Sequence, residues 1–170
     1  MYVVTGGAGF IGANLVRHLL TARHDLRVVV LDALTYAGHR ESLAGLELDR
    51  RYRFVLSDVC DARQVRALVE EERPGVVLHL AAESHVDRSL YGAGVFVRTN
   101  VEGTLNVLEA VRAHPGTRLV HVSTDEVYGS LGPKGAFTED TPLDPSSPYS
   151  ASKAASDLMA LAYHRTFGLD

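Results

Sequence analysis

The 170-residue sequence lacks several features that mark whole classes of protein. Cys60 is its only cysteine, so no internal disulfide can form, which fits a reducing compartment such as the cytoplasm. Its longest apolar runs are far too short to span a bilayer. The first residues enter a glycine-rich stretch without the basic and apolar regions of a signal peptide. We therefore expect a cytoplasmic protein with no membrane partner.

Charge and histidine spacing argue against two further classes. A net charge of −4 offers no electrostatic basis for binding nucleic acid. The eight histidines have no metal-ligand spacing such as His-Glu-x-x-His, so no metal site is expected. His79 and His121 fall in strand-like runs and are interpreted as core or sheet-edge residues. Cys60 is interpreted as a small packing residue.

The sequence does contain a regular alternation of strand-like and helix-like segments. Apolar, β-branched runs predict five strands, at residues 2–5, 26–32, 52–56, 75–80 and 118–123. Apolar spacing and cap signals predict four helices, around residues 11–20, from Asp61 to Pro74, from Val97 to near Pro115, and from about Tyr149 to Phe167. This order predicts an α/β fold with a doubly wound parallel sheet covered on both faces.

Three glycines mark the turn between the first strand and the first helix. Gly6, Gly9 and Gly12 have the spacing Gly-x-x-Gly-x-x-Gly, which lets the backbone approach a diphosphate at the helix N-terminus. Asp32 ends the second strand, where a carboxylate accepts ribose hydroxyls and repels a 2′-phosphate, so NAD is favoured over NADP. Asp58, after the third strand, is placed to meet the adenine amino group. Plain turn glycines and turn aspartates are the alternative interpretation.

A second set of polar residues lies towards the end of the chain. Tyr149 and Lys153 are one helical turn apart, and a cation beside the tyrosine is expected to lower its pKa, as a general base requires. Thr124, Asp125 and Glu126 follow the fifth strand, at the edge where parallel sheets bind ligands. We interpret the five residues as an acid–base site, with one structural acid as the alternative.

These motifs together resemble a known family. The glycine motif with Tyr149 and Lys153 is similar to the extended short-chain dehydrogenases/reductases. The stretches at residues 32–38, 80–89, 99–104 and 123–129 resemble the dTDP-glucose 4,6-dehydratase family, and the similarity covers essentially the whole chain. The resemblance implies a Rossmann NAD-binding domain over residues 1–170, truncated before a sixth strand and the substrate-binding region. It also implies a homodimer through the helices around residues 95–111 and 149–167.

The resemblance also implies a NAD site and a nucleotide-sugar substrate, dTDP-glucose. Ser84 and Thr124 are expected to touch the substrate. The residues expected to hold NAD are Gly6, Gly9, Phe10, Ile11, Gly12, Asp32, Ala33, Leu34, Thr35, Asp58, Val59, Leu80, Ala81, Ala82, Glu83, Ser84, Thr99, Tyr149 and Lys153.

The chemistry implied by the resemblance assigns a role to each polar residue. Tyr149 takes the proton of the carbon-4 hydroxyl while hydride passes to NAD, and Thr124 steadies the alkoxide. Glu126 then removes the proton on carbon 5. Asp125 protonates the departing carbon-6 hydroxyl, so it must hold a proton, which burial beside Glu126 is expected to favour. Hydride return to carbon 6 gives a 4-keto-6-deoxy sugar nucleotide.

Three alternatives remain at this stage. A nucleotide-sugar 4-epimerase shares Asp32, Tyr149 and Lys153 but needs no acid pair for loss of water, so Asp125 and Glu126 discriminate against it. A GDP-mannose dehydratase is disfavoured because Asp32 argues against NADP. A NAD-binding module without turnover is the third, because the family's carboxyl-terminal region, which closes over the sugar, is not in the sequence.

Overall fold

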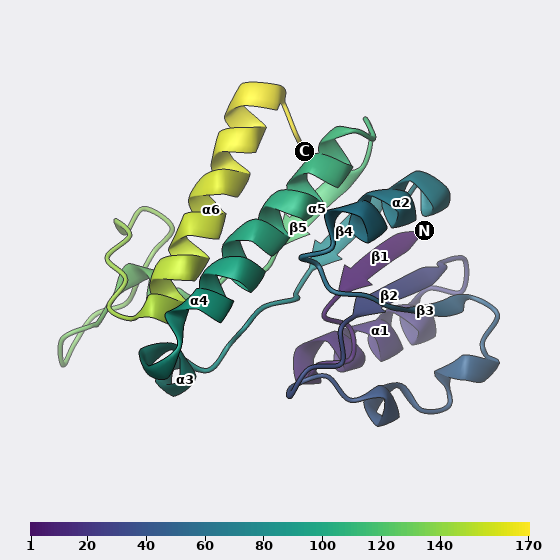
Figure 1. The fold of residues 1–170 in the computed structure, drawn as a ribbon, viewed down its shortest axis with the longest axis horizontal. Coiled ribbons are helices and arrows are strands. Elements are labelled where there is room, and N and C mark those ends of the chain that lie inside the picture. The colour runs from purple at the N-terminus through teal and green to yellow at the C-terminus, as the bar shows by residue number, and fades with distance from the viewer.

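The computed structural model describes residues 1–170 and contains one five-stranded parallel sheet. The strand order is β3-β2-β1-β4-β5, which reverses direction between β1 and β4. The strands are β1 (Tyr2–Thr5), β2 (Val28–Asp32), β3 (Tyr52–Leu56), β4 (Val76–His79) and β5 (Arg118–His121). The predicted doubly wound parallel sheet is therefore confirmed, with the predicted strands shortened by up to two residues at an end (Figure 1).

All four expected helices are present, with additional short elements. The α-helices are α1 (Phe10–Ala22), α2 (Ala62–Glu72), α3 (Val86–Tyr91), α4 (Ala93–Phe96), α5 (Gly103–Arg112) and α6 (Pro148–Phe167). A π-helical stretch, η3 (Val97–Glu102), joins α4 to α5, and three short 3₁₀ turns are η1 (Arg40–Leu43), η2 (Leu46–Leu48) and η4 (Asp125–Tyr128). None of the helices combines the length and the apolar character needed to cross a membrane.

The sheet separates two apolar layers, and β2 supplies both. All five residues of β2 are buried, because its alternate side chains point to opposite faces. Val29 packs in the cluster that includes residues of α2 and α5, whereas Val30 packs in the cluster that includes residues of α1. Figure 1 shows α2, α5 and α6 on one side of the sheet and α1 on the other. This double cover explains the near-continuous apolar run in β2.

Cap residues fix where two of the helices begin. The Asp61 carboxylate accepts hydrogen bonds from the backbone N–H groups of Arg63 and Gln64, as expected at the start of α2. The Gln64 side-chain amide donates to the Asp61 carboxylate at 2.9 Å instead of accepting from the Asp61 backbone N–H, so the cap is one-sided. In α6, Ser147 and Ser150 form a complete capping box. That box sets the position of the first turn of α6, which carries Tyr149.

The two strand histidines and the single cysteine have the structural positions expected of them. His79 is 2% exposed and lies between the hydroxyls of Thr5 (2.6 Å) and Thr104 (3.0 Å). Burial holds the pKa of His79 well below its ordinary value. His121, the last residue of β5, lies 3.0 Å from the Asp157 carboxylate through Nε2. Cys60 is half-buried, and burial raises its pKa to about 11.

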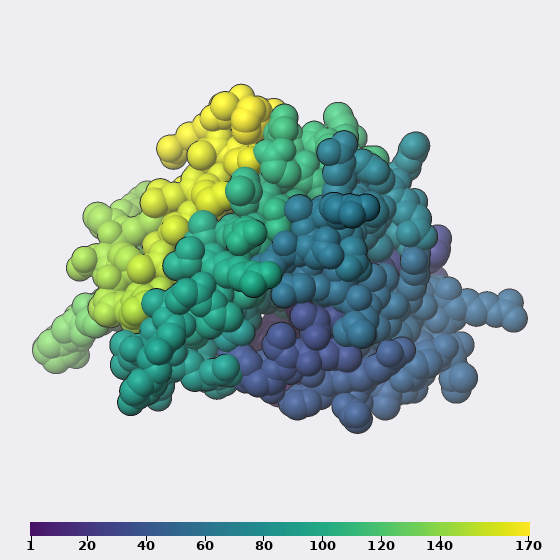
Figure 2. Space-filling model, viewed as in Figure 1, coloured from purple at the N-terminus to yellow at the C-terminus, as the bar shows by residue number.

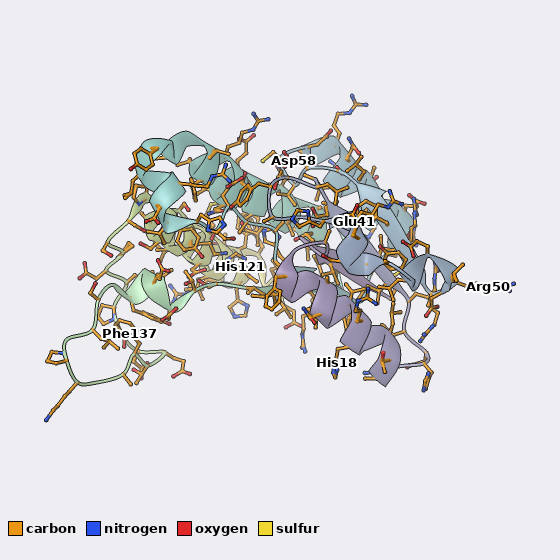
Figure 3. All side chains as sticks on the ribbon, turned by 90° about the horizontal axis from the view of Figure 1, so that it is seen from below. His18, Glu41, Arg50, Asp58, His121 and Phe137 are labelled. Carbon is orange, nitrogen blue, oxygen red and sulfur yellow. The ribbon has the colours of Figure 1, made fainter.

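One edge of the sheet is β5, and the backbone N–H of Leu119 in this strand donates to the carbonyl of Asp170 at 2.8 Å. On the face of the sheet that carries α1, the β5 side chain Val120 and the following Val122 are exposed. The segment between η4 and α6 projects away from the sheet, as Figure 1 shows and as the labelled Phe137 marks in Figure 3.

Candidate functional site

A crevice of about 390 Å³ lies at the carboxyl ends of the strands. Residues that follow each of the five strands line it, and it is centred where the strand order reverses, the usual ligand position in open parallel sheets. Figure 2 shows a hollow between the indigo atoms of the segment after β2 and the teal atoms of the segment around α3. In Figure 3, the labelled Asp58 and His121 mark the ends of the outermost strands, β3 and β5.

The crevice brings together nearly all the residues expected to hold a cofactor. Of that set only Leu34 is not in the lining, because its side chain packs against the α1-side core while its backbone N–H turns to Asp32. The sequence analysis missed six lining residues, which lie beside the expected residues in the sequence: Leu31, Ala37, Gly38, Ser57, Val122 and Ser123. Thr124 lines the crevice, whereas Asp125 and Glu126 do not.

Two positions of the glycine turn, Gly6 and Gly12, are packed too tightly for a side chain. A Cβ on Gly12 would lie 2.2 Å from the carbonyl oxygen of Gly6. A Cβ on Gly6 would lie 2.6 Å from the backbone nitrogen of Ala81, and its φ of +69° also favours glycine. Gly9 precedes α1 without any side-chain cap, so the first N–H groups of the helix are left for another acceptor. The turn therefore fits a diphosphate.

Asp32 lies behind the glycine turn and is 8% exposed. One carboxylate oxygen accepts from the backbone N–H of Ala8 and the other from that of Leu34, both at 2.8 Å. A Cβ on Gly38 would lie 2.5 Å from this carboxylate, so the loop after β2 closes directly on it. Each carboxylate oxygen keeps a further lone pair for an added hydroxyl. These residues fit the adenosine ribose of a dinucleotide without a 2′-phosphate.

Asp58 lies at the rim of the crevice. It is exposed, and its carboxylate accepts from the backbone N–H of Cys60 at 2.9 Å. This contact is the turn role considered as the alternative for Asp58. The same carboxylate still lines the crevice, so the predicted contact with adenine stays a prediction.

Tyr149 and Lys153 are both buried on α6, at 8% and 5% exposure. Burial raises the pKa of the Tyr149 phenol, and a hydrogen bond with Thr124 partly opposes this. Burial also lowers the pKa of Lys153, against the attraction of Asp157. The Lys153 ammonium donates to the Val122 carbonyl at 2.7 Å. The expectation that Lys153 lowers the pKa of Tyr149 is therefore wrong for this structure, because the ammonium is directed at the Val122 carbonyl, just after β5.

The two acids after β5 lie in the η4 turn, outside the crevice. Thr124 caps this turn by accepting from the backbone N–H of Glu126 at 3.3 Å. Asp125 and Glu126 are both exposed. The expected burial of Asp125 is therefore wrong, because no part of residues 1–170 covers the turn. In this structure the two carboxyl groups stand beside the crevice and face solvent.

Asp157 is a positioning residue that the sequence analysis missed. It accepts from the Ser123 hydroxyl at 2.5 Å and lies 3.0 Å from His121 Nε2, so it ties α6 to the end of β5. Tyr149, Lys153 and Asp157 recur every four residues on α6. This four-residue spacing could have pointed to Asp157 in the sequence, since residues four apart share one helix face.

Comparisons with known proteins agree with this geometry. The family model described as GDP-mannose 4,6 dehydratase matches residues 3–170. A dTDP-glucose 4,6-dehydratase of Xanthomonas campestris pv. campestris is 55% identical over 99% of this chain and 50% of its own length. A dTDP-glucose 4,6-dehydratase of Streptomyces venezuelae, solved with NAD bound, is 52% identical with a TM-score of 0.94, over 100% of this chain and 53% of that one.

A more distant solved structure represents the main alternative. The UDP-glucose 4-epimerase of Thermus thermophilus, in complex with NAD, is 36% identical with a TM-score of 0.88, over 99% of this chain and 52% of that one. The chain thus spans about half the length of the relatives it matches. The resemblance found in the sequence is confirmed: the chain belongs to the GDP-mannose 4,6 dehydratase family, and it is similar to the N-terminal half of dTDP-glucose 4,6-dehydratases.

Proposed function

We propose that the chain is the NAD-binding part of a dTDP-glucose 4,6-dehydratase, a lyase that converts dTDP-glucose into dTDP-4-keto-6-deoxyglucose. The observation that carries the proposal is the convergence of two sets of residues on one crevice. Buried Asp32 and the glycine turn lie at one end, and buried Tyr149 and Lys153 lie at the other, beside the acid-bearing η4 turn. The NAD bound in similar solved structures supports this choice of cofactor.

NAD, when bound, supplies a hydride acceptor for sugar carbon 4 that later gives the hydride back at carbon 6. The residues of this chain bind and orient it. Asp32 accepts the adenosine ribose hydroxyls, and the turn from Gly6 to Gly12 receives the diphosphate. Tyr149 and Lys153 reach the nicotinamide ribose at the far end of the crevice.

The proton transfers fall to α6 and to the turn after β5. Tyr149 is the acceptor of the carbon-4 hydroxyl proton, for which its phenol must first be ionised, and the Thr124 hydroxyl that hydrogen-bonds Tyr149 would lie beside the developing oxyanion. Glu126 removes the proton on carbon 5, and Asp125 delivers a proton to the departing carbon-6 oxygen. A sugar seated over η4 would lie against these exposed acids and exclude water from them.

Two observations favour dehydration over epimerisation. The relatives named dTDP-glucose 4,6-dehydratase reach 55% identity, whereas the epimerase of known structure reaches 36%. Epimerisation at carbon 4 also requires no acid–base pair for the loss of water. Asp125 and Glu126, side by side on one turn next to Thr124, are the pair that this elimination needs.

The test is an incubation of the purified protein with NAD and dTDP-glucose in deuterated water, followed by mass spectrometry of the sugar nucleotide. We expect loss of one water and entry of deuterium at carbon 5. Glu126→Gln is expected to lower this conversion by about 10²-fold or more, because the base for carbon 5 is removed. Glu139→Gln, in the projecting segment between η4 and α6, is the matched control and is expected to keep wild-type conversion.

Other outcomes of this incubation identify the alternatives. A galactose-type isomer of unchanged mass would establish an epimerase and contradict the dehydratase proposal. Unconverted substrate together with measurable NAD binding would identify a cofactor-binding module without turnover.

We further propose that the protein is a cytoplasmic homodimer joined through α4–α5 and α6. Exposed apolar side chains on these helices support the dimer: Val95, Val97, Leu105, Leu158, Leu161 and Phe167. The unpaired Cys60 supports a reducing compartment. Sedimentation of the same preparation measures the mass, and a monomer at micromolar concentration would contradict the dimer.

A further inference from the structure

Tyr36 lies outside the crevice but links its two walls. Its neighbours Thr35 and Ala37 line the crevice, whereas Tyr36 does not. The ring turns instead to the start of α3 and to the residue that precedes it. The guanidinium carbon of Arg88 lies 3.8 Å from the ring centroid, and the His85 ring lies 5.3 Å away, centroid to centroid. These contacts join the loop after β2 to the loop after β4 (the segments that bound the hollow in Figure 2).

The backbone of each wall is anchored separately. On the β2 side, the N–H of His39 donates to the carbonyl of Ala8 at 3.1 Å, next to the glycine turn. On the β4 side, the Asn100 side chain accepts from the Glu83 N–H at 2.8 Å and donates to the Glu83 carbonyl at 3.0 Å. Each wall thus has its own anchor, and the contacts of Tyr36 connect one wall to the other.

The surroundings of Tyr36 orient the ring for its contact with Arg88. The ring is 37% exposed and Arg88 is also exposed, so this is a surface cation–π contact. The backbone N–H of Ser84 approaches the Tyr36 hydroxyl at 3.4 Å, which orients the ring along the β4-side wall. Burial and the nearby Glu83 carboxyl raise the pKa of Tyr36, so the phenol stays neutral.

We propose that Tyr36 and Arg88 are positioning residues that clasp the two walls of the crevice and slow the release of a bound dinucleotide. The inference rests on the proposed NAD site but not on the dehydratase chemistry. Thr35 on one wall and Ser84 on the other both line the crevice that a dinucleotide reaching from Asp32 to Tyr149 would occupy. It leaves more easily when these walls separate, and separation breaks the Tyr36–Arg88 contact. Slow release of the dinucleotide matters in a catalytic cycle in which NAD accepts a hydride and then returns it.

The test is the rate at which bound NADH leaves the protein, followed by the loss of its fluorescence after excess NAD is added. Tyr36→Ala and Arg88→Ala are each expected to release NADH about fivefold faster, which corresponds to about 1 kcal/mol, the upper end for a ring–cation contact between exposed side chains. The double variant is expected to be no faster than either single variant, because both changes remove one contact. Tyr36→Phe keeps the ring and is expected to stay within about twofold of the wild type.

The matched control is Tyr91→Ala on the same side of the crevice, because this ring is 94% exposed. It is expected to leave the release rate unchanged. If Tyr36→Ala released NADH at the wild-type rate, with an unchanged urea unfolding midpoint, the proposal that the Tyr36–Arg88 contact slows release would be overturned. Release from Tyr36→Phe as fast as from Tyr36→Ala would also overturn it. A wild-type protein that binds neither NAD nor NADH would overturn the proposed function as well, so the two failures are distinguishable.

Discussion

The two ends of the crevice are built in different ways. At the β1–β2 end, the backbone of the glycine turn and a buried carboxylate make the site, and Asp32 already holds two backbone N–H groups. At the β5–α6 end, side chains make the site, and its two acids face solvent. A site made from backbone needs the chain to be folded before any ligand arrives. The properties of a site made from exposed side chains depend on what covers those side chains. The environment of its acids is therefore complete only when substrate is bound.

The largest expected effect comes from breaking the backbone-built end. In Gly12→Ala the new Cβ would lie 2.2 Å from the Gly6 carbonyl oxygen, so the turn or α1 must move. We expect a loss of about 3 kcal/mol in the free energy of unfolding and no measurable NAD binding. Urea denaturation and NAD titration check this. Gly94→Ala is the control, since nothing lies within 4 Å of its added Cβ, and its stability should not fall. If Gly12→Ala kept its NAD affinity, the proposed role of the glycine turn in binding NAD would be contradicted.

A pair of matched substitutions sharpens the comparison between the ends. In Asp32→Asn, one of two backbone N–H groups would face an amide donor, and we expect about 2 kcal/mol less stability together with weaker NAD binding. Asp125→Asn at the other end changes an exposed side chain, so the unfolding midpoint and the NAD affinity should stay at wild-type values. Only its turnover should fall. Equal loss of stability in both variants would show that the two ends are not built differently.

The smallest expected effect is the pH dependence of stability that comes from His79, in the interior strand β4. Burial keeps the pKa of His79 well below its ordinary value, so at low pH only the unfolded chain takes up this proton. The stability that neutral His79 contributes is present above about pH 6.5 and falls by up to about 1.4 kcal/mol per pH unit below it. Urea midpoints between about pH 7.5 and pH 5.5 measure this slope. His79→Gln should flatten it and the exposed His24→Gln should not; equal slopes in all three proteins would exclude His79.

The sequence predicted the strands and the cofactor end well because both depend on local rules. Alternating apolar runs place β2, and only glycine fits at Gly12. The same rules did not reveal α3, whose six residues are too few to display a helical period. They also did not reveal the side-chain direction of Leu34, whose φ of +51° turns it to the core.

The chemical end was harder to predict because its properties depend on contacts between distant segments. Residue spacing placed Lys153 one turn from Tyr149, but the position of the Val122 carbonyl decides where the ammonium points. Spacing likewise placed Asp125 next to Glu126, but their exposure depends on what packs over η4. A pKa depends on how deeply the group is buried and on which groups surround it in three dimensions. The spacing of residues within one helical turn does not reveal either property.

The π-helical stretch Val97–Glu102 determines the direction in which the side chains of the preceding helix, α4, point around the helix axis. A π turn holds one more residue than an α turn, and each residue of an α-helix advances the chain by about 100° around the axis. The wide turn lets Asn100 hold Glu83 while buried Phe96 still meets the Tyr149 ring, edge to face at 6.2 Å. Deleting even an exposed residue such as Arg98 would rotate Phe96 away from that ring. The length of this stretch is therefore constrained more tightly than its composition, and insertions or deletions here should be far rarer among related chains than substitutions.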